Sequence, residues 1–230
     1  GSANTFTADQ TINANLTQSG TLVQFTPTNG FVAKGTFNSG LIPATGSGVR
    51  MMWYPGAAAF RAGYVSGTQW DTPGDYSTAF GYNAKANGSA AFAAGYAPSA
   101  GGDQSVAIGD GATASGNGSI AIGITATATQ LGALALGFET TANGHYSTAM
   151  GNYASANGAN GGFIFGDLST TSDINATRDN QFVVRAQQMW FGTNNNVTSN
   201  TGRFLETSTG AYLTTGGAWT NSSSRALKVR

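Results

Sequence analysis

An internal repeat of 14 residues, running from Ser77 to about Asn160, constrains the fold of this chain more than any other feature. An alanine stands two residues before each repeated glycine, and another stands five residues after it. Three columns that hold through six copies do not arise by chance, so this segment must fold as a repeat architecture. The six glycines are Gly81, Gly95, Gly109, Gly123, Gly137 and Gly151.

Large and small residues alternate before each glycine, as in Val106-Ala107-Ile108-Gly109. Alternation with a period of two is typical of a β-strand whose two faces differ. A second short segment of small residues follows, as in Ala112-Thr113-Ala114, and turn residues such as Gly116-Asn117-Gly118 close the unit. Two short strands and two turns predict one coil of a narrow β-solenoid, and the glycine density excludes a helix.

Stacked coils pair about 4.8 Å apart, so six coils would extend over roughly 30 Å. Such repeats bury apolar surface by stacking. One face of the main strand carries Phe, Val, Ile, Leu and Met, whereas the other carries Ala and Gly. A coil this thin has one interior, so the second face must pack on something else, and we expect copies of the same chain. Either face could fill the coil; we favour large residues beside the axis between copies.

Two copies, Ser105-Val106-Ala107-Ile108-Gly109 and Ser119-Ile120-Ala121-Ile122-Gly123, resemble the repeat of the YadA-type head of trimeric autotransporter adhesins. A third, Ser147-Thr148-Ala149-Met150-Gly151, resembles the variant of that repeat in tail-fibre-like proteins. The resemblance covers about 84 of the 230 residues. It implies a left-handed parallel β-roll, with three chains side by side in a homotrimer that serves as an adhesive head.

The expected fold class is therefore all-β, a parallel β-roll in a homotrimer that is flanked by small β-domains. We expect residues 1–73 to form an N-terminal β cap domain and residues 74–162 to form the roll of six repeats. Residues 163–230 would form a C-terminal β connector that leads to a chaperone domain not contained in this sequence. Opening residues Gly1-Ser2 resemble a cloning remnant, so we expect the natural protein to be longer.

Strand signals also occur outside the repeat. Val49–Tyr54 and Ala58–Val65 predict a pair of strands around Pro55-Gly56. Residues 161–167 predict an irregular final coil, because Gly166 comes one residue later than the repeat requires. Residues 168–180 are polar and predict a loop.

The composition excludes several classes of function. Only 9% of the residues are charged and the net charge is zero, which argues against nucleic-acid binding and against electrostatic attachment to a membrane surface. The chain has no cysteine, so disulfides and thiolate metal sites are absent. No run approaches 18 apolar residues, so we expect no membrane-spanning helix. We also expect no cofactor.

The C-terminal residues, from Gly210 to Lys228, resemble the junction before the intramolecular chaperone of endosialidase-type tail fibres. In that family the chaperone drives trimerisation and then cuts itself off, using a serine at the junction and a lysine five residues later. The matching residues are Ser223 and Lys228. The family often has an aspartate after the serine, where this chain has Ser224. The resemblance therefore implies a vestigial junction for self-cleavage.

Other chemistry is sparse. His145 is the single histidine and is expected in an exposed turn, so we predict no metal site. A glycosidase needs two converging acids, and no two carboxylates share a repeat column. A threonine ladder needs threonine on successive coils. We expect Ala112 and Thr140 beside the segment Thr125–Thr129, which would exclude such a ladder.

Aromatic residues near the start of the roll are the candidate ligand-binding residues. Aromatic faces bind sugars and proteins by stacking and apolar contact. The alternative is that these rings form the core of the cap domain and of the trimer. The candidates are Trp70, Tyr76, Tyr82 and Tyr96.

Together these features predict a trimeric surface-fibre or adhesin segment that recognises a glycan or protein on a target cell without catalysis. It would be extracellular, on a bacterial cell surface or in a phage fibre. Its partners would be its own copies and the target, without nucleic acid and without direct insertion into a membrane. Two alternatives remain open, a tailspike-like fibre that degrades polysaccharide and a passive structural spacer.

Overall fold

The computed structural model describes residues 32–191, 202–207 and 211–220. Within them the fold is all-β: 21 strands form three sheets, and the helical content is one 3-10 helix, η1 (Pro55–Ala57). The compact unit that holds all of these elements spans Gly35–Arg230. The all-β solenoid of the predicted fold class is confirmed, with about ten turns and coils of about 14 residues.

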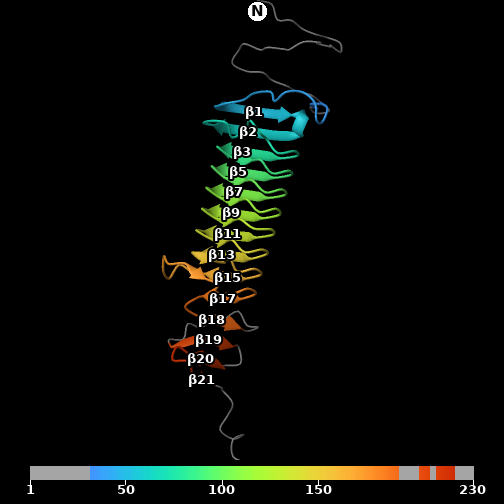
Figure 1. Cartoon of the computed structure of the whole chain (residues 1–230). Helices are drawn as coiled ribbons and strands as arrows, with labels where there is room; N and C mark the ends of the chain where they lie inside the picture. Colours follow the sequence, from blue (N-terminus) through green and yellow to red (C-terminus); the bar gives the residue numbers. More distant parts are fainter. Residues whose placement is uncertain (1–31, 192–201, 208–210, 221–230) are drawn as a thin grey trace, which may run out of the picture. The chain divides into compact units, whose positions relative to one another are not determined.

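The longest sheet has ten strands in the order β1-β2-β3-β5-β7-β9-β11-β13-β15-β17 (Figure 1). β1 and β2 pair antiparallel around η1, as the sequence predicts, and every later pair is parallel. The strands are β1 (Gly48–Tyr54), β2 (Ala59–Val65), β3 (Thr78–Tyr82), β5 (Phe92–Tyr96), β7 (Val106–Asp110), β9 (Ile120–Ile124), β11 (Leu134–Phe138), β13 (Thr148–Asn152), β15 (Phe163–Gly166) and β17 (Phe182–Arg185).

A second, seven-stranded sheet is built from two-residue strands in the order β16-β14-β12-β10-β8-β6-β4. Its strands alternate along the chain with those of the long sheet, so each coil supplies one strand to each sheet. In both sheets the register is one repeat, as shown by the pairs Ala107↔Ala121 and Ala114↔Ala128. The strands are β4 (Lys85–Ala86), β6 (Ser99–Ala100), β8 (Thr113–Ala114), β10 (Thr127–Ala128), β12 (Thr141–Ala142), β14 (Ala154–Ser155) and β16 (Ile174–Asn175).

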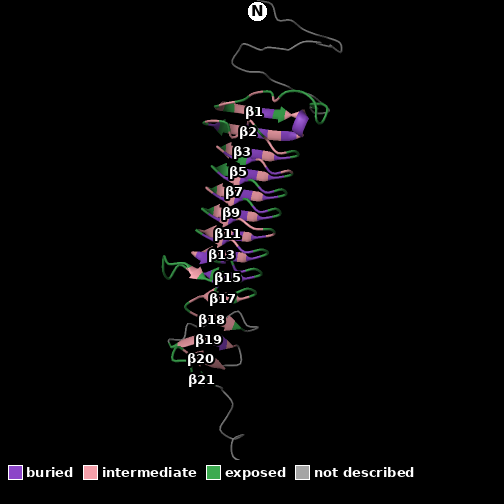
Figure 2. Cartoon of the chain, in the orientation of Figure 1, coloured by how far each residue is buried: buried purple, intermediate pink, exposed green. Residues whose placement is uncertain are grey.

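Alanine fills the interior of the coils. Both repeated alanine columns are completely buried, as Ala107 and Ala114 illustrate, and the buried positions recur from coil to coil (Figure 2). The large residues of the long strands lie outside, where Ile122 remains 38% exposed. Because a coil of about 14 residues, with one strand of five residues and one of two, leaves little space between its strands, small side chains fill it. This arrangement excludes the alternative in which the large residues occupy the interior.

Glycines of the repeat mark a close approach between coils. Gly109 has φ +128°, and a Cβ built on it would lie 2.0 Å from the carbonyl oxygen of Gly123 in the next coil. Only glycine provides both the positive φ and the missing side chain. Steric contact between coils therefore explains why all six copies have glycine at this position.

Polar side chains join the turns of successive coils. The carboxylate of Asp103 accepts a hydrogen bond from the backbone N–H of Ser89 at 3.0 Å. Asn117 accepts one in the same way from the N–H of Asp103 at 3.1 Å. These contacts satisfy turn donors that no strand partner reaches. Asp103 therefore has a structural role, because it links the turns of successive coils.

Arg61 closes the N-terminal part of the alanine interior. It stands in register with Ala79 of the alanine column and is completely buried. Its guanidinium donates hydrogen bonds of 2.8 Å to the carbonyls of Phe60, Ser77 and Ala86, and one of 2.7 Å to the Ser77 hydroxyl. Burial lowers the pKa of Arg61 to about 10. The side chain thus remains a hydrogen-bonded cation at neutral pH.

The long sheet continues across both boundaries expected for the roll, at residues 73/74 and 162/163. β2 pairs with β3 on one side, and β15 and β17 extend the sheet on the other. Gly166 pairs with Gly151, so the turn absorbs the extra residue and the predicted irregular coil is confirmed. It is not the last coil, because β17 pairs with β15 beyond it. The loop predicted for residues 168–180 is also wrong in part, since that segment contains β16, the short strand of the irregular coil.

The third sheet has four strands in the order β18-β19-β20-β21. Glu206 is almost fully buried there, forms an ion pair with Arg203 and accepts a hydrogen bond from Gln188 at 3.1 Å. The Arg203 guanidinium lies 4.0 Å from the centre of the Tyr212 ring. The strands are β18 (Met189–Phe191), β19 (Arg203–Thr207), β20 (Tyr212–Thr214) and β21 (Trp219–Thr220).

Candidate functional site

The outer face of the long sheet is apolar over most of its strands. Its residues alternate with the buried alanines and are half-buried or exposed; Phe80, Phe163 and Phe165 each retain 38% of their accessible surface. Contiguous apolar patches of this kind mark interaction sites. We call this surface the apolar face. It includes Phe60, Phe80, Phe92, Val106, Ile108, Ile120, Ile122, Leu134, Leu136, Met150, Phe163, Phe165 and Phe182.

Three tyrosines form a stacked ladder on the same side of the sheet. The ring centres of Tyr64 and Tyr82 are 5.4 Å apart, and those of Tyr82 and Tyr96 are 4.6 Å apart with an interplanar angle of 4°. In-register pairing of β2, β3 and β5 produces this stacking. Tyr82 and Tyr96 are the last residues of their strands and are 36% and 56% exposed. Asp110 follows in the same column.

Trp70 and Tyr76 have opposite environments. Trp70 is completely buried, donates its indole N–H to the carbonyl of Ala84 at 2.8 Å and has the Arg50 guanidinium 5.3 Å from its ring centre. Its ring is therefore closed to a surface ligand. Tyr76 is 58% exposed and stacks on Phe37 with ring centres 5.0 Å apart.

A cavity of about 550 Å³ is lined in part by Asp75, the residue before Tyr76, and we call it the cap pocket. Two carboxylates, Asp71 and Asp75, share its wall with the hydroxyl groups of Tyr54 and Thr72. No repeat column contains this pair, because both acids precede the first copy of the repeat, so the pattern of the repeat does not indicate it. The lining residues are Asn38, Gly40, Leu41, Ile42, Tyr54, Gly56, Ala57, Asp71, Thr72, Pro73 and Asp75.

A smaller depression of about 340 Å³ is lined by Thr125, Glu139, Thr141 and Asp173. It too holds two carboxylates, which come from positions 34 residues apart (173 − 139). The irregular coil that contains β16 brings Asp173 there, so no repeat column could have indicated the pair.

Threonines align on the short-stranded sheet, contrary to the prediction. Thr127 pairs with Thr113 on one side and Thr141 on the other. The expected neighbours, Ala112 and Thr140, are wrong, because both are completely buried in the interior column. The ladder spans three coils, and its threonines are half-buried.

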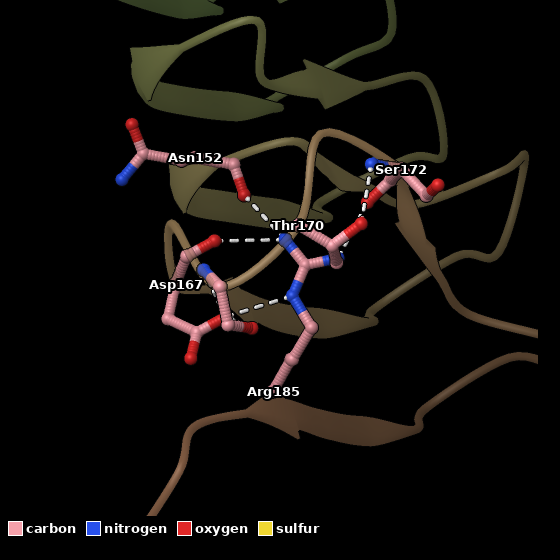
Figure 3. Close-up of polar contacts among 6 residues, drawn as sticks. Asn152, Asp167, Thr170, Ser172 and Arg185 are labelled. Atoms are coloured by element: carbon pink, nitrogen blue, oxygen red, sulfur yellow. Dashed lines mark hydrogen bonds and ion pairs between the residues drawn. The ribbon is translucent and has the colours of Figure 1, made fainter.

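Arg185 organises the irregular coil near the C-terminal end of the long sheet (Figure 3). It stands in register with Gly166 and forms an ion pair with Asp167 at 2.9 Å. Its guanidinium also donates to the backbone carbonyls of Asn152, Asp167 and Ser172. This cluster holds the loop after β15 by hydrogen bonds to its backbone carbonyls, so we assign it a structural role.

The pKa of Asp167 is lowered, first by the hydrogen bond from the Ser169 hydroxyl and also by Arg185. A carboxylate with a lowered pKa keeps its contacts above its unfolded pKa and loses them as pH falls through the folded value. In a carboxyl carbon NMR titration, we expect Asp167 to titrate below the usual aspartate range. Ser169→Ala and Arg185→Gln should each raise that pKa. An ordinary pKa in the unaltered protein would contradict the geometry.

The remaining candidates supply no site. His145 lies exposed in a turn, where its backbone N–H donates to Asn160 at 2.8 Å. Among the described residues, no group of three or more His, Cys, Asp or Glu could hold a metal ion. No helix in that part of the chain is long and apolar enough to cross a membrane. Ser223 and Lys228 lie outside the described residues.

The family comparison agrees with the geometry of the coils. The coils match the YadA head domain repeat. The matches cover residues 73–97, 100–126, 114–140, 128–154 and 142–161. They coincide with the stacked coils from β3 to β14, whose interior is alanine. The search of curated proteins and the search of solved structures returned no match.

YadA heads belong to adhesins, which are trimeric, surface-exposed and typically without enzymatic activity. The matched residues make up less than half of this chain. The alanines and glycines that recur in every copy of the repeat build the coil. The variable large residues form the apolar face. An adhesin-like repeat protein with an exposed apolar face is thus the coarse description of the molecule.

Proposed function

We propose that this chain is a segment of a trimeric surface fibre that recognises a glycan or protein on a target cell, without catalysis. The observation that carries the proposal is the apolar face on coils that match YadA head repeats. Such a face is costly in water, since each buried large apolar side chain contributes about 1.5–3 kcal/mol. Packing three copies around one axis removes it from water on every chain.

The location of the apolar face supports self-association over capping by this chain. It lies on the sheet side opposite the alanine interior and recurs on successive coils, so one flat partner of the same length matches it throughout. Copies of the same chain meet that condition in closed cyclic symmetry. The geometry favours association in general, and the number three comes from the family likeness.

Light scattering tests the assembly. We expect about 70 kDa, three times the chain mass of 23.3 kDa. Replacing Ile108 and Ile122 together by Asp should yield monomers or insoluble protein, because six charges would be buried in each trimer. Thr113→Asp with Thr127→Asp is the matched control on the short-stranded sheet and should remain trimeric. A monomeric mass for the unaltered protein would contradict the proposal.

Recognition without turnover is the second element of the proposal. Incubation with intact bacterial cells should retain the protein on the target surface. A passive spacer would show no retention on any target cell, and a tailspike-like enzyme would release reducing sugar from surface polysaccharide. The proposal excludes both outcomes.

The extracellular location, on a bacterial surface or in a phage fibre, follows from this function and from the family likeness. We further propose that Ser223 and Lys228 belong to a vestigial junction for self-cleavage, on the resemblance of residues 210–228 alone. The partners that follow are further copies of the chain and a surface glycan or protein, with no nucleic acid and no membrane insertion.

A further inference from the structure

The cap pocket combines features that suit a sugar ring. Its volume of about 550 Å³ lies within the range of small-molecule sites, about 300–1,000 Å³. One wall is formed by residues 38–42, a second by Tyr54 and η1, and a third by the segment Asp71–Asp75. The pocket therefore lies between three segments that backbone contacts hold together. Asn38 N–H, for example, donates to the carbonyl of Gly56 at 2.9 Å.

The carboxylates of Asp71 and Asp75 differ in their hydrogen bonds. Asp71 uses one oxygen to accept the backbone N–H of Gly46 at 2.8 Å, which anchors the loop before β1. Asp75 is exposed, and its carboxylate makes no hydrogen bond within the described residues, although its backbone carbonyl accepts the N–H of Ala90. The Asp75 carboxylate is thus free to accept hydrogen bonds from ligand hydroxyl groups, as an ionised carboxylate is an acceptor only.

The negative charge of the cap pocket favours uncharged sugars over acidic ones. It contains two acids and no Lys, Arg or His among its lining residues. An acidic sugar would bring a third negative charge into this site without a compensating cation, which costs free energy. A sugar with hydroxyl groups alone offers donors to both carboxylates and to Asn38 without that repulsion.

An aromatic pair adjoins the polar wall. Phe37 and Tyr76 each neighbour a lining residue in sequence, Asn38 and Asp75, and their rings stack with an interplanar angle of 19°. Tyr76 has φ +60°, the turn conformation that recurs at the same position of later coils, as at Ala90 and Gln104. Aromatic rings beside carboxylates and amides give the apolar and polar contacts that a sugar ring requires.

We propose that the cap pocket binds one ring of an uncharged oligosaccharide, with Asp75 accepting its hydroxyl hydrogens and Tyr76 contacting its apolar side. This inference rests on the proposed function and names the ligand class and place of recognition. It also moves recognition from the stacked tyrosines Tyr82 and Tyr96 to the cap. Those two rings lie on the side of the sheet that the trimer is proposed to cover.

Isothermal titration of the full chain tests the pocket with two sets of hexasaccharides. The uncharged set contains cello-, malto-, manno- and N-acetylchito-hexaose; the acidic set contains hyaluronan and oligogalacturonate. We expect at least one uncharged hexasaccharide to bind and both acidic ones to fail. Binding of an acidic sugar with equal affinity, or of none, would overturn the inference.

Two variants locate the site. Asp75→Ala and Tyr76→Asn should each weaken binding at least tenfold; asparagine accommodates the positive φ. Asp110→Ala removes an exposed carboxylate outside the pocket and should leave affinity unchanged. A melting curve for each variant separates lost binding from lost folding. Unchanged affinity in Asp75→Ala would place the sugar elsewhere.

Cell retention distinguishes this inference from the proposed function. If Asp75→Ala still binds target cells as the unaltered protein does, recognition stands and the pocket assignment fails. If the unaltered protein binds no cells, the proposed function fails. Release of reducing sugar from the bound hexasaccharide, abolished in Asp71→Asn or Asp75→Asn, would replace binding by hydrolysis and overturn both.

Discussion

Gly123→Ala is expected to disrupt coil stacking and lower the free energy of unfolding by more than about 3 kcal/mol. A Cβ at this position would lie 1.9 Å from the carbonyl oxygen of Gly137, and φ is +137°, a conformation that alanine rarely adopts. The backbone strain alone costs about 1–3 kcal/mol. Relief of the clash requires neighbouring coils to separate, which weakens the parallel hydrogen bonds between β9 and β11.

Gly101→Ala is the matched control for this substitution. Gly101 also lies between two strands of the roll, but a Cβ there would meet nothing within 4 Å, and its φ is not in the positive range. Replacing glycine by alanine at such a site leaves stability unchanged or raises it slightly. Urea denaturation followed by circular dichroism, at equal protein concentrations, measures both variants. Equal stability of the two would refute the steric account of the glycine column.

Ala121→Leu is expected to have a similarly large effect, because it places three more carbon atoms in the alanine interior. Ala121 is completely buried and pairs in register with Ala107 and Ala135, which are also completely buried. Overpacking of a close-packed core costs about 1–3 kcal/mol, and more where nothing can move aside. We expect a loss near 3 kcal/mol, since the coils above and below have the same dimensions.

Ala94→Leu makes the same chemical change on the outer side of the sheet. Ala94 is half-buried between Phe80 and Ile108, in a column that otherwise holds large residues. The added leucine should therefore change stability by less than about 0.5 kcal/mol and leave the oligomeric state unchanged. A greater loss in Ala94→Leu than in Ala121→Leu would reverse the assignment of inside and outside.

The repeat predicts the coil well because the number of residues in each coil is set by the chain itself. Fourteen residues set the spacing at which Gly109 meets Gly123 and Ala107 meets Ala121, and parallel pairing then follows from stacking. The strands on either side of Pro55-Gly56 are predicted for the same reason, since local turn chemistry determines them. A prediction fails when the expected register is off by one residue. Thr127, for example, pairs with Thr113 and Thr141 and not with the expected Ala112 and Thr140.

The candidate site could be predicted only in part. Sequence reasoning places exposed tyrosines on the first coils, and Tyr76, Tyr82 and Tyr96 are exposed. It cannot distinguish them from Trp70, because burial of that ring depends on the hairpin and loop that fold over it. Nor can it find the cap pocket, whose carboxylates face residues about 30 positions earlier in the chain.

By itself, the sequence determined the period, the strand class, the coil count of the regular segment and the need for a partner surface. The tertiary structure alone decided which strand face is inside. Both faces are apolar, so hydrophobicity does not distinguish them. The folded coil does, because alanine fills the space between the two sheets in every regular coil and the larger Ile164 enters that column only in the irregular coil. The structure also decided how the coils continue past the repeat, where Arg61 and Arg185 satisfy backbone carbonyls in place of small residues.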